Sequence, residues 1–296
     1  MTCFFVRGLS RSGGTLMATI LDAHPDVAMS YETYEHLLDS GEEPPHQLDD
    51  ILQMIGQLGV KSIRRNLFSG SKNVRPEITK FVRRAERAGI DHETLGRLFE
   101  KHFDSGLRLD SFQGRMLLVE QLTLEKMWRE GKVHWGAKIL SVYDQLDEIY
   151  PDAKYLFMLR DGRDVAASRK KVGDFKQSIS EIASGWCRQI AKFEHFAAGS
   201  NGRAFFVPYE RMAYEPEAEL RKLMANLNLT WNERILSFHT LNLSIHRNAT
   251  GHLSGKQLKS PISTSSIGRW KEDLTTEEIS EFEAKAGQTL EKLGYI

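Results

Sequence analysis

The fold is decided by the N-terminal stretch Thr2-Cys-Phe-Phe-Val-Arg-Gly-Leu-Ser-Arg-Ser-Gly-Gly-Thr-Leu-Met17. Residues 2–7 are mostly β-branched or aromatic, which predicts a short buried strand. A glycine-rich turn follows at 8–14, and residues 15–22 carry apolar side chains at helical spacing. In such a strand–turn–helix unit, the N–H groups of the turn and of the helix N-terminus point at one spot. The stretch therefore predicts a phosphate-binding turn.

The spacing of this turn is close to that of a P-loop. Gly13 follows Gly8 after four residues, and Gly14-Thr15 stands where the P-loop pattern has Gly-Lys-Ser/Thr. The lysine, which would reach the β- and γ-phosphates of a nucleoside triphosphate, is missing, and Arg11 is the nearest cation that could replace it. The turn is therefore either a site for a different phosphate ligand or an ordinary glycine-rich turn without one.

The composition argues against several classes of protein. Of 296 residues 41% are hydrophobic, which suffices for a full core, and Lys+Arg and Asp+Glu number 40 each. This balance leaves no global field that would attract nucleic acid or an anionic membrane. Cys3 and Cys187 form no disulfide framework, and no residues have metal-ligand spacing. We therefore expect a soluble, cytoplasmic protein with no signal peptide, membrane span or metal.

The predicted strands and helices alternate along the chain. Strands are expected at 2–7, 27–29, 115–119, 134–140, 154–159 and 203–207, and helices at 15–22, within 48–102, at 123–130 and 142–149, from 162, and at 179–196, 215–226, 232–238 and 276–293. This order predicts an α/β fold of three layers, in which a central parallel sheet is flanked by helices and ligands bind at the C-terminal ends of the strands. We expect a single domain, 1–296, with a helical insertion at about 40–115.

The helical insertion is rich in cations. They are Lys61, Arg64, Arg65, Lys72, Arg75, Arg83, Arg84 and Arg87. The simpler interpretation is a solvated helical face, and the alternative is a lid or wall that favours acidic ligands.

A second candidate anion site follows the strand predicted at 154–159. The segment is Arg160-Asp-Gly-Arg-Asp-Val-Ala-Ala-Ser168. Arg160 lies at the strand end, and Ser168 lies about two helical turns further on. An arginine fork and a hydroxyl suit a phosphate, although a salt bridge and a solvent-facing serine are the alternative. Arg163 and Asp164 could form a surface ion pair that contributes little.

Three motifs, in order, resemble those of sulfotransferases that use 3′-phosphoadenosine 5′-phosphosulfate (PAPS). Arg11-Ser-Gly-Gly-Thr-Leu16 resembles their 5′-phosphosulfate loop, and the segment 160–168 resembles their 3′-phosphate motif. Ser265-Ser-Ile-Gly-Arg-Trp-Lys271 is similar to their C-terminal segment, which closes over the cofactor. Within the superfamily, Thr15-Leu-Met-Ala-Thr-Ile-Leu-Asp-Ala-His-Pro-Asp-Val27, followed by Glu32-Thr33, looks like the tyrosylprotein sulfotransferases.

The resemblance implies the P-loop-like sulfotransferase fold and transfer of a sulfuryl group from PAPS to a hydroxyl, with adenosine 3′,5′-bisphosphate (PAP) as the product. The cofactor-binding residues that it implies are Arg11, Ser12, Gly13, Gly14, Thr15, Leu16, Arg160, Ser168, Arg269, Trp270 and Lys271. Gly14 departs from the family, which usually has threonine or serine there. Trp270 would pack near the adenine, and a plain core aromatic is the alternative.

Four residues match the catalytic positions of the family. Glu32 would act as the base for the acceptor hydroxyl, and Lys138 would meet the bridging oxygen as charge builds on the leaving phosphate. Arg11 would hold the sulfuryl or 5′-phosphate oxygens, and Ser254 would contact the leaving group. Without the resemblance, Glu32 would be taken as a surface glutamate. His24 is a second candidate base, although His-Pro after a helix more often forms a cap.

The resemblance leaves the acceptor open among a peptide tyrosine, a glycan and a small molecule, with the helical insertion as its wall or lid. A second copy of the chain is a further candidate partner. We expect no membrane anchor and no paired cysteines like those of the animal tyrosylprotein enzymes, which would suit a cytoplasmic relative. A small-molecule P-loop kinase is the main alternative, but the lysine and a strand-end aspartate for Mg²⁺ are missing. A non-catalytic nucleotide-binding protein is the third, and Glu32 and Lys138 count against it.

Overall fold

The computed structural model describes residues 1–30, 38–39, 47–63, 76–87, 89–139, 143–172, 177–246 and 257–296. It contains a five-stranded sheet with the strand order β2-β3-β1-β4-β5. The strands are β1 (Cys3–Gly8), β2 (Val27–Ser30), β3 (His134–Lys138), β4 (Lys154–Leu159) and β5 (Ala204–Pro208). The pairs β1–β4, β4–β5 and β2–β3 are parallel, and this confirms the predicted α/β fold.

Helices and short 3₁₀ turns connect the strands. The helices are α1 (Gly14–Ala23), α2 (Leu48–Ile63), α3 (Pro76–Arg87), α4 (His92–Asp104), α5 (Phe112–Arg129), α6 (Tyr143–Ile149), α7 (Gly162–Val172), α8 (Ile179–Gly199), α9 (Tyr209–Tyr214), α10 (Pro216–Leu227), α11 (Trp270–Asp273) and α12 (Thr276–Lys292). The turns are η2 (Glu233–Ile235), η3 (Phe238–Thr240), η4 (Ser244–His246) and η5 (Gln257–Lys259). Among the described residues, no helix is both long and apolar enough to cross a membrane.

The chain divides into two compact units. The first consists of Met1–Cys3, Leu21–Asp152 and Leu241–His252, and the second of Phe4–Ile20, Ala153–Thr240 and Leu253–Ile296. The single domain with a helical insertion at about 40–115 stays a prediction.

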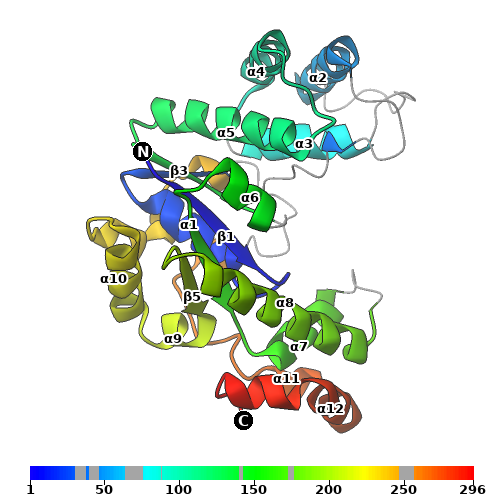
Figure 1. Cartoon of the computed structure of the whole chain (residues 1–296), viewed down its shortest axis with the longest axis vertical. Helices are drawn as coiled ribbons and strands as arrows, with labels where there is room; N and C mark the ends of the chain where they lie inside the picture. Colours follow the sequence, from blue (N-terminus) through cyan, green and yellow to red (C-terminus); the bar gives the residue numbers. More distant parts are fainter. Residues whose placement is uncertain are drawn as a thin grey trace. The chain divides into compact units, whose positions relative to one another are not determined.

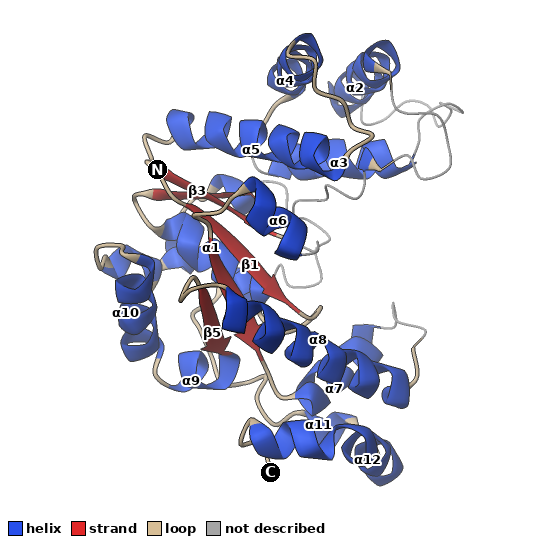
Figure 2. Ribbon diagram, viewed as in Figure 1, coloured by secondary structure: helices blue, strands red, loops and turns tan. Residues whose placement is uncertain are grey.

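The first unit contains the β2–β3 pair and a group of helices. In this pair Val27 lies opposite His134, and α5 packs on both strands. The helices α2, α3 and α4 pack against one another, and α4 also contacts α5 (Figure 2). The strand predicted at 115–119 is wrong, because these residues lie inside α5. A short apolar run is compatible with a strand or with a buried helix, and Ser111, whose side chain accepts the Gly114 N–H, caps a helix here.

The second unit contains β1, β4 and β5 together with the helices that follow them. Its core includes the stacked rings of Phe157 and Phe193, whose centroids lie 4.3 Å apart. The helix α12 packs against α8, and α11 lies beside α7 (Figure 1). The capping box predicted at the start of α12 is present, formed by Thr275 and Glu278. The helix predicted at 232–238 is wrong, since η2 and η3 occupy this part of the chain.

Candidate functional site

The glycine loop (residues 8–16) is held in a tight shape by its own backbone. The Ser12 N–H and hydroxyl both donate to the Leu9 carbonyl, at 3.0 and 2.7 Å. Gly13 has a φ of 95°, and a Cβ at this position would lie 2.7 Å from the Tyr209 ring. Arg11 has a φ of 79°, which is unusual for a residue with a side chain. Strained backbone of this kind is concentrated at functional sites, and it turns the Arg11 side chain out of the loop.

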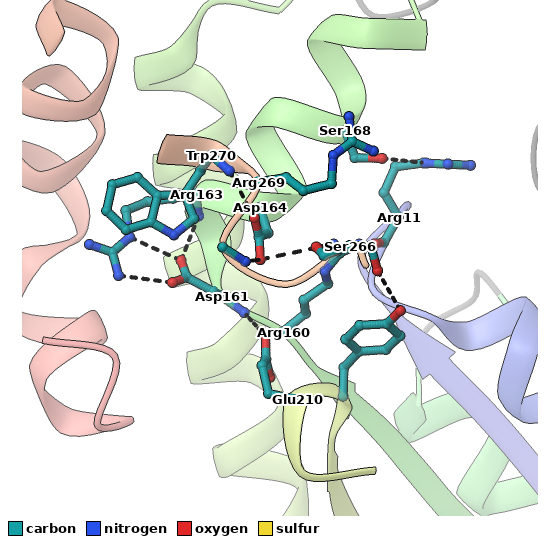
Figure 3. Close-up of polar contacts among 12 residues, drawn as sticks. Arg11, Arg160, Asp161, Arg163, Asp164, Ser168, Glu210, Ser266, Arg269 and Trp270 are labelled. Atoms are coloured by element: carbon teal, nitrogen blue, oxygen red, sulfur yellow. Dashed lines mark hydrogen bonds and ion pairs between the residues drawn. The ribbon is translucent and has the colours of Figure 1, made fainter. Parts of the chain in front are cut away.

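Arg11 joins the glycine loop to the second motif (residues 160–168). Its Nε donates to the Ser168 Oγ at 2.9 Å, and its carbonyl accepts a hydrogen bond of 2.8 Å from Arg160 Nη1 (Figure 3). Two cations and a hydroxyl that the sequence assigns to separate anion sites therefore lie in one place. The contact uses neighbouring parallel strands, because the loop follows β1 and Arg160 follows β4.

Arg160 is a buried cation without a close carboxylate among the described residues. It is 7% exposed, and besides the Arg11 carbonyl it donates through Nη2 to the Ser266 carbonyl. Its nearest ion-pair partner there is Asp164, at 4.0 Å, and its Nε has no partner in the described part of the chain. The guanidinium lies over the Tyr209 ring, 4.7 Å from the centroid. A buried cation whose hydrogen bonds go to neutral carbonyls is well suited to an anionic ligand.

The strand end that carries Arg160 is fixed by two hydrogen bonds to its backbone. Trp186 Nε1 donates to the Arg160 carbonyl at 3.1 Å, and the Asp161 N–H donates to Glu210 Oε1 at 2.9 Å. Glu210 also accepts from the Tyr295 hydroxyl at 3.2 Å. Burial raises the pKa of the Glu210 carboxyl, and the Asp161 N–H opposes this change. The side chain of Arg160 thus projects from a rigid base.

Arg163 and Asp164 do not form the surface ion pair that was considered for them. Both are buried, because α11 and α12 pack on α7 and exclude water from these positions. Arg163 pairs with Asp161 at 2.8 Å and with Glu283 at 2.7 Å. Asp164 accepts two backbone N–H groups from the closing segment (residues 265–271).

The closing segment lies against the second motif. Asp164 accepts the N–H of Gly268 at 2.8 Å and that of Trp270 at 3.0 Å. Trp270 is half-buried and stacks on the Arg163 guanidinium, 3.9 Å from the ring centroid, so it is no core aromatic. Arg269 pairs with Asp273 at 2.5 Å, and Lys271 is exposed.

The structure describes most of the remaining predicted residues. Gly14, Thr15 and Leu16 form the first turn of α1, and Lys138 is the last residue of β3, half-buried. His24 is buried, and its Nδ1 accepts the Asp26 N–H at 3.1 Å. Glu32 and Ser254 lie outside the described residues. No cluster of three potential metal ligands occurs in the part of the chain that is described.

Two side chains of this site carry no role in the sequence analysis. Tyr209 supports Arg160, and its hydroxyl lies 2.6 Å from the Ser266 Oγ. Tyr209 directly follows β5, just as Arg160 directly follows β4. Its position at the end of a parallel strand could therefore have identified it as a site residue from the sequence. Ser266 had no such signal, because its role depends on a contact 57 residues away in sequence.

Comparison with known proteins identifies the group to which this site belongs. The sequence profile described as "Sulfotransferase family" matches residues 4–233, most of the chain. The chain belongs to the sulfotransferase family.

This sulfotransferase is similar to several protein-tyrosine sulfotransferases. It is 26% identical to the protein-tyrosine sulfotransferase of Drosophila melanogaster over 260 residues, 80% of this chain and 40% of that protein. It is 23% identical to protein-tyrosine sulfotransferase A of Caenorhabditis elegans over 300 residues, 98% of this chain and 66% of that protein. The chain thus spans less than two thirds of the length of these relatives. The resemblance to the tyrosylprotein branch is confirmed.

Solved structures confirm the sulfotransferase fold. The sulfotransferase domain from the curacin biosynthetic pathway superposes with a TM-score of 0.56 at 16% identity, covering 97% of this chain and 96% of that domain. The sulfotransferase domain from the Synechococcus PCC 7002 olefin synthase gives 0.50 at 16% identity, with 96% and 93% covered. At this identity the likeness concerns the fold alone.

Proposed function

We propose that the protein transfers the sulfuryl group of PAPS to an acceptor hydroxyl and releases PAP. The observation that carries this proposal is Arg160, a buried cation held by carbonyls beside Arg11 and Ser168. A nucleotide with phosphate at both the 3′ and the 5′ position supplies the negative charge that this arrangement lacks.

The residues of the site fit such a cofactor. Arg160 and Ser168 would hold the 3′-phosphate, together with the cations Arg269 and Lys271 of the closing segment. Arg11 and the N–H groups of residues 12–16 would hold the 5′ side, where the N-terminus of α1 favours negative charge. The cofactor itself supplies the activated sulfuryl group.

The catalytic roles of the remaining residues follow from the family. Glu32 would take the proton of the acceptor hydroxyl, and Lys138 and Ser254 would stabilise the charge on the leaving phosphate. Sulfuryl transfer, like phosphoryl transfer, has a loose transition state, so the protein mainly positions groups and neutralises charge.

The tyrosine hydroxyl of a protein is the first acceptor to test, because the relatives above are named protein-tyrosine sulfotransferases. The predicted helical insertion is rich in cations, and this composition would suit an acidic peptide around the tyrosine. A glycan or a small molecule stays a candidate. The small-molecule kinase is not favoured, because the loop lacks the P-loop lysine.

The experiment that tests this function follows labelled sulfate from PAPS to an acceptor. An acidic peptide with one tyrosine should become labelled, and the same peptide with phenylalanine should not. Glu32→Gln should lower kcat by at least about a hundredfold, a usual loss for a general base, while PAP binding stays unchanged. Glu217→Gln, in an exposed ion pair with Arg221, serves as the matched control. Full turnover of Glu32→Gln would overturn the assigned base, and absence of transfer to hydroxyls of any class would overturn the function.

A further inference from the structure

Asp164 is a buried carboxylate that holds the backbone of another segment. It lies in the first turn of α7, is 2% exposed, and accepts the N–H groups of Gly268 and Trp270 at 2.8 and 3.0 Å. Trp270 begins α11, and Arg269, which precedes it, makes no side-chain cap. The carboxylate thus provides, from a distant part of the sequence, the cap that α11 lacks.

Asp164 is not the only residue that contacts the closing segment. Arg160 donates to the Ser266 carbonyl, and the Ser266 hydroxyl lies 2.6 Å from that of Tyr209. Arg163 stacks on Trp270 (Figure 3). The attachment through Asp164 is the one that fixes the backbone on both sides of Arg269.

Asp164 places a negative charge next to an arginine that is proposed to bind a phosphate. Its carboxylate lies 4.0 Å from Arg160 Nη2, where it opposes the binding of any anion to that arginine. A site for a phosphate would bind more tightly without this charge, unless the carboxylate contributes something that outweighs the repulsion.

We propose that Asp164 is a positioning residue for the 3′-phosphate. By holding the N–H groups of Gly268 and Trp270, it sets the backbone from which Arg269 and Lys271 reach that phosphate. This inference rests on the proposed function, because it assumes PAPS as the cofactor.

The test compares PAP with 5′-AMP, which lacks only the 3′-phosphate, by titration calorimetry. In Asp164→Asn one N–H of the closing segment faces an amide NH₂ in place of an oxygen. PAP should then bind about tenfold more weakly while 5′-AMP binding stays unchanged, because one charge-assisted hydrogen bond is lost. If Asp164→Asn only removed the repulsion between the carboxylate and the 3′-phosphate, PAP would instead bind more tightly.

Two further variants separate positioning from loss of stability. Ser178→Ala removes the N-cap of α8, far from the closing segment in sequence, and should lower Tm by a few degrees without changing the preference for PAP. Gly268→Ala adds a methyl group into open space but disfavours the local φ of 72°. Gly268→Ala should weaken the binding of PAP and leave the binding of 5′-AMP unchanged. This comparison tests the proposal even if Asp164→Asn does not fold.

The outcomes are distinct for the inference and for the function. A wild-type preference for PAP that persists in Asp164→Asn and in Gly268→Ala would overturn the inference alone, as would tighter binding of PAP by Asp164→Asn. Equal binding of PAP and 5′-AMP by the wild-type protein would overturn the cofactor assignment and the inference together.

Discussion

Two groups of buried charged residues in this protein differ in how their cations are satisfied. In the first unit, Lys126 and Lys132 are each paired with carboxylates, those of Asp22 and Glu130. In the second unit, Arg160 donates to carbonyls, and its nearest carboxylate among the described residues is 4.0 Å away. The side chains of all three cations are almost fully buried, so exposure does not separate the two groups.

The difference indicates what each group does. In the first group the charges balance, and Asp22 also accepts the Met29 N–H at 2.8 Å, which ties the end of α1 to β2. Its role is to hold the backbone. In the second group Arg163 pairs with Asp161 and Glu283, and Asp164 accepts two backbone N–H groups, whereas the hydrogen bonds of Arg160 go to carbonyls. The unmatched cation marks the ligand site.

The largest effect is expected from breaking the matched group. Lys126→Met leaves the buried carboxylate of Asp22 without its closest cation and should lower the free energy of unfolding by about 3–5 kcal/mol. The measurement is urea unfolding, and the matched control is Lys292→Met, which removes a lysine from an exposed pair with Glu194 and should change stability by less than about 1 kcal/mol. Equal effects of the two variants would show that the buried group does not stabilise the fold.

Removal of the unmatched cation should act on binding more than on folding. Arg160→Met should weaken PAP binding by roughly a hundredfold, or about 2.7 kcal/mol, since a charge-assisted contact to phosphate is lost. Its unfolding free energy should fall by less than that of Lys126→Met, because the hydrogen bonds of the arginine go to the neutral carbonyls of Arg11 and Ser266 and leave no closely paired buried carboxylate behind. Calorimetry and urea unfolding measure the two quantities. Unchanged PAP affinity would contradict the role assigned to Arg160.

A smaller effect is expected at the contact between the two anion-binding segments. Ser168→Ala removes the hydroxyl that Arg11 Nε contacts at 2.9 Å and that would bind the 3′-phosphate. PAP affinity should fall about tenfold, while stability changes by less than about 0.5 kcal/mol. Ser105→Ala, at the exposed end of α4, is the control and should leave PAP binding unchanged. A wild-type affinity in Ser168→Ala would exclude the serine from the phosphate site.

The smallest effect concerns the pH dependence of stability at the base of the site. Because burial raises the pKa of Glu210 in the folded state, its contribution to stability is full below the unfolded value near 4.5 and is lost as pH rises through the folded pKa. Relative to Glu210→Gln, the wild-type protein should therefore lose stability as the pH rises above 4.5. The loss should be about 1.4 kcal/mol for each tenfold difference between the acid dissociation constants of the folded and unfolded states. Urea unfolding at several pH values measures this. A difference that grows with pH in favour of the wild type would contradict the assignment.

Much of the fold was predictable because its strongest signals are local. The strand at 154–159 agrees with β4 residue for residue, and the capping box of α12 needs only Thr275 and Glu278. The segment 115–119 was mistaken for a strand because its apolar run is buried within a long helix. Burial of this kind depends on the helices that pack around it, and the run itself does not encode them.

The candidate site was predictable in part for the same reason. Arg11, Arg160 and Ser168 were identified from glycine spacing and from their place after strands, and the structure brings them together. The role of Asp164 was not identified from the sequence, because its partners are backbone N–H groups 104 and 106 residues away. A backbone N–H is present at almost every residue, so its acceptor leaves no mark in the sequence.

The most direct measurement is a thermal-shift titration of the wild-type protein with PAP, beside ATP plus Mg²⁺. At 100 times its dissociation constant, PAP should stabilise the fold by roughly 2.7 kcal/mol, which corresponds to a rise in Tm of roughly 5–10 °C. We predict this rise with PAP and none with ATP. A rise with ATP and Mg²⁺ but not with PAP would contradict the assignment of Arg160 and its neighbours as a PAPS site. The absence of a rise with either nucleotide would contradict it as well.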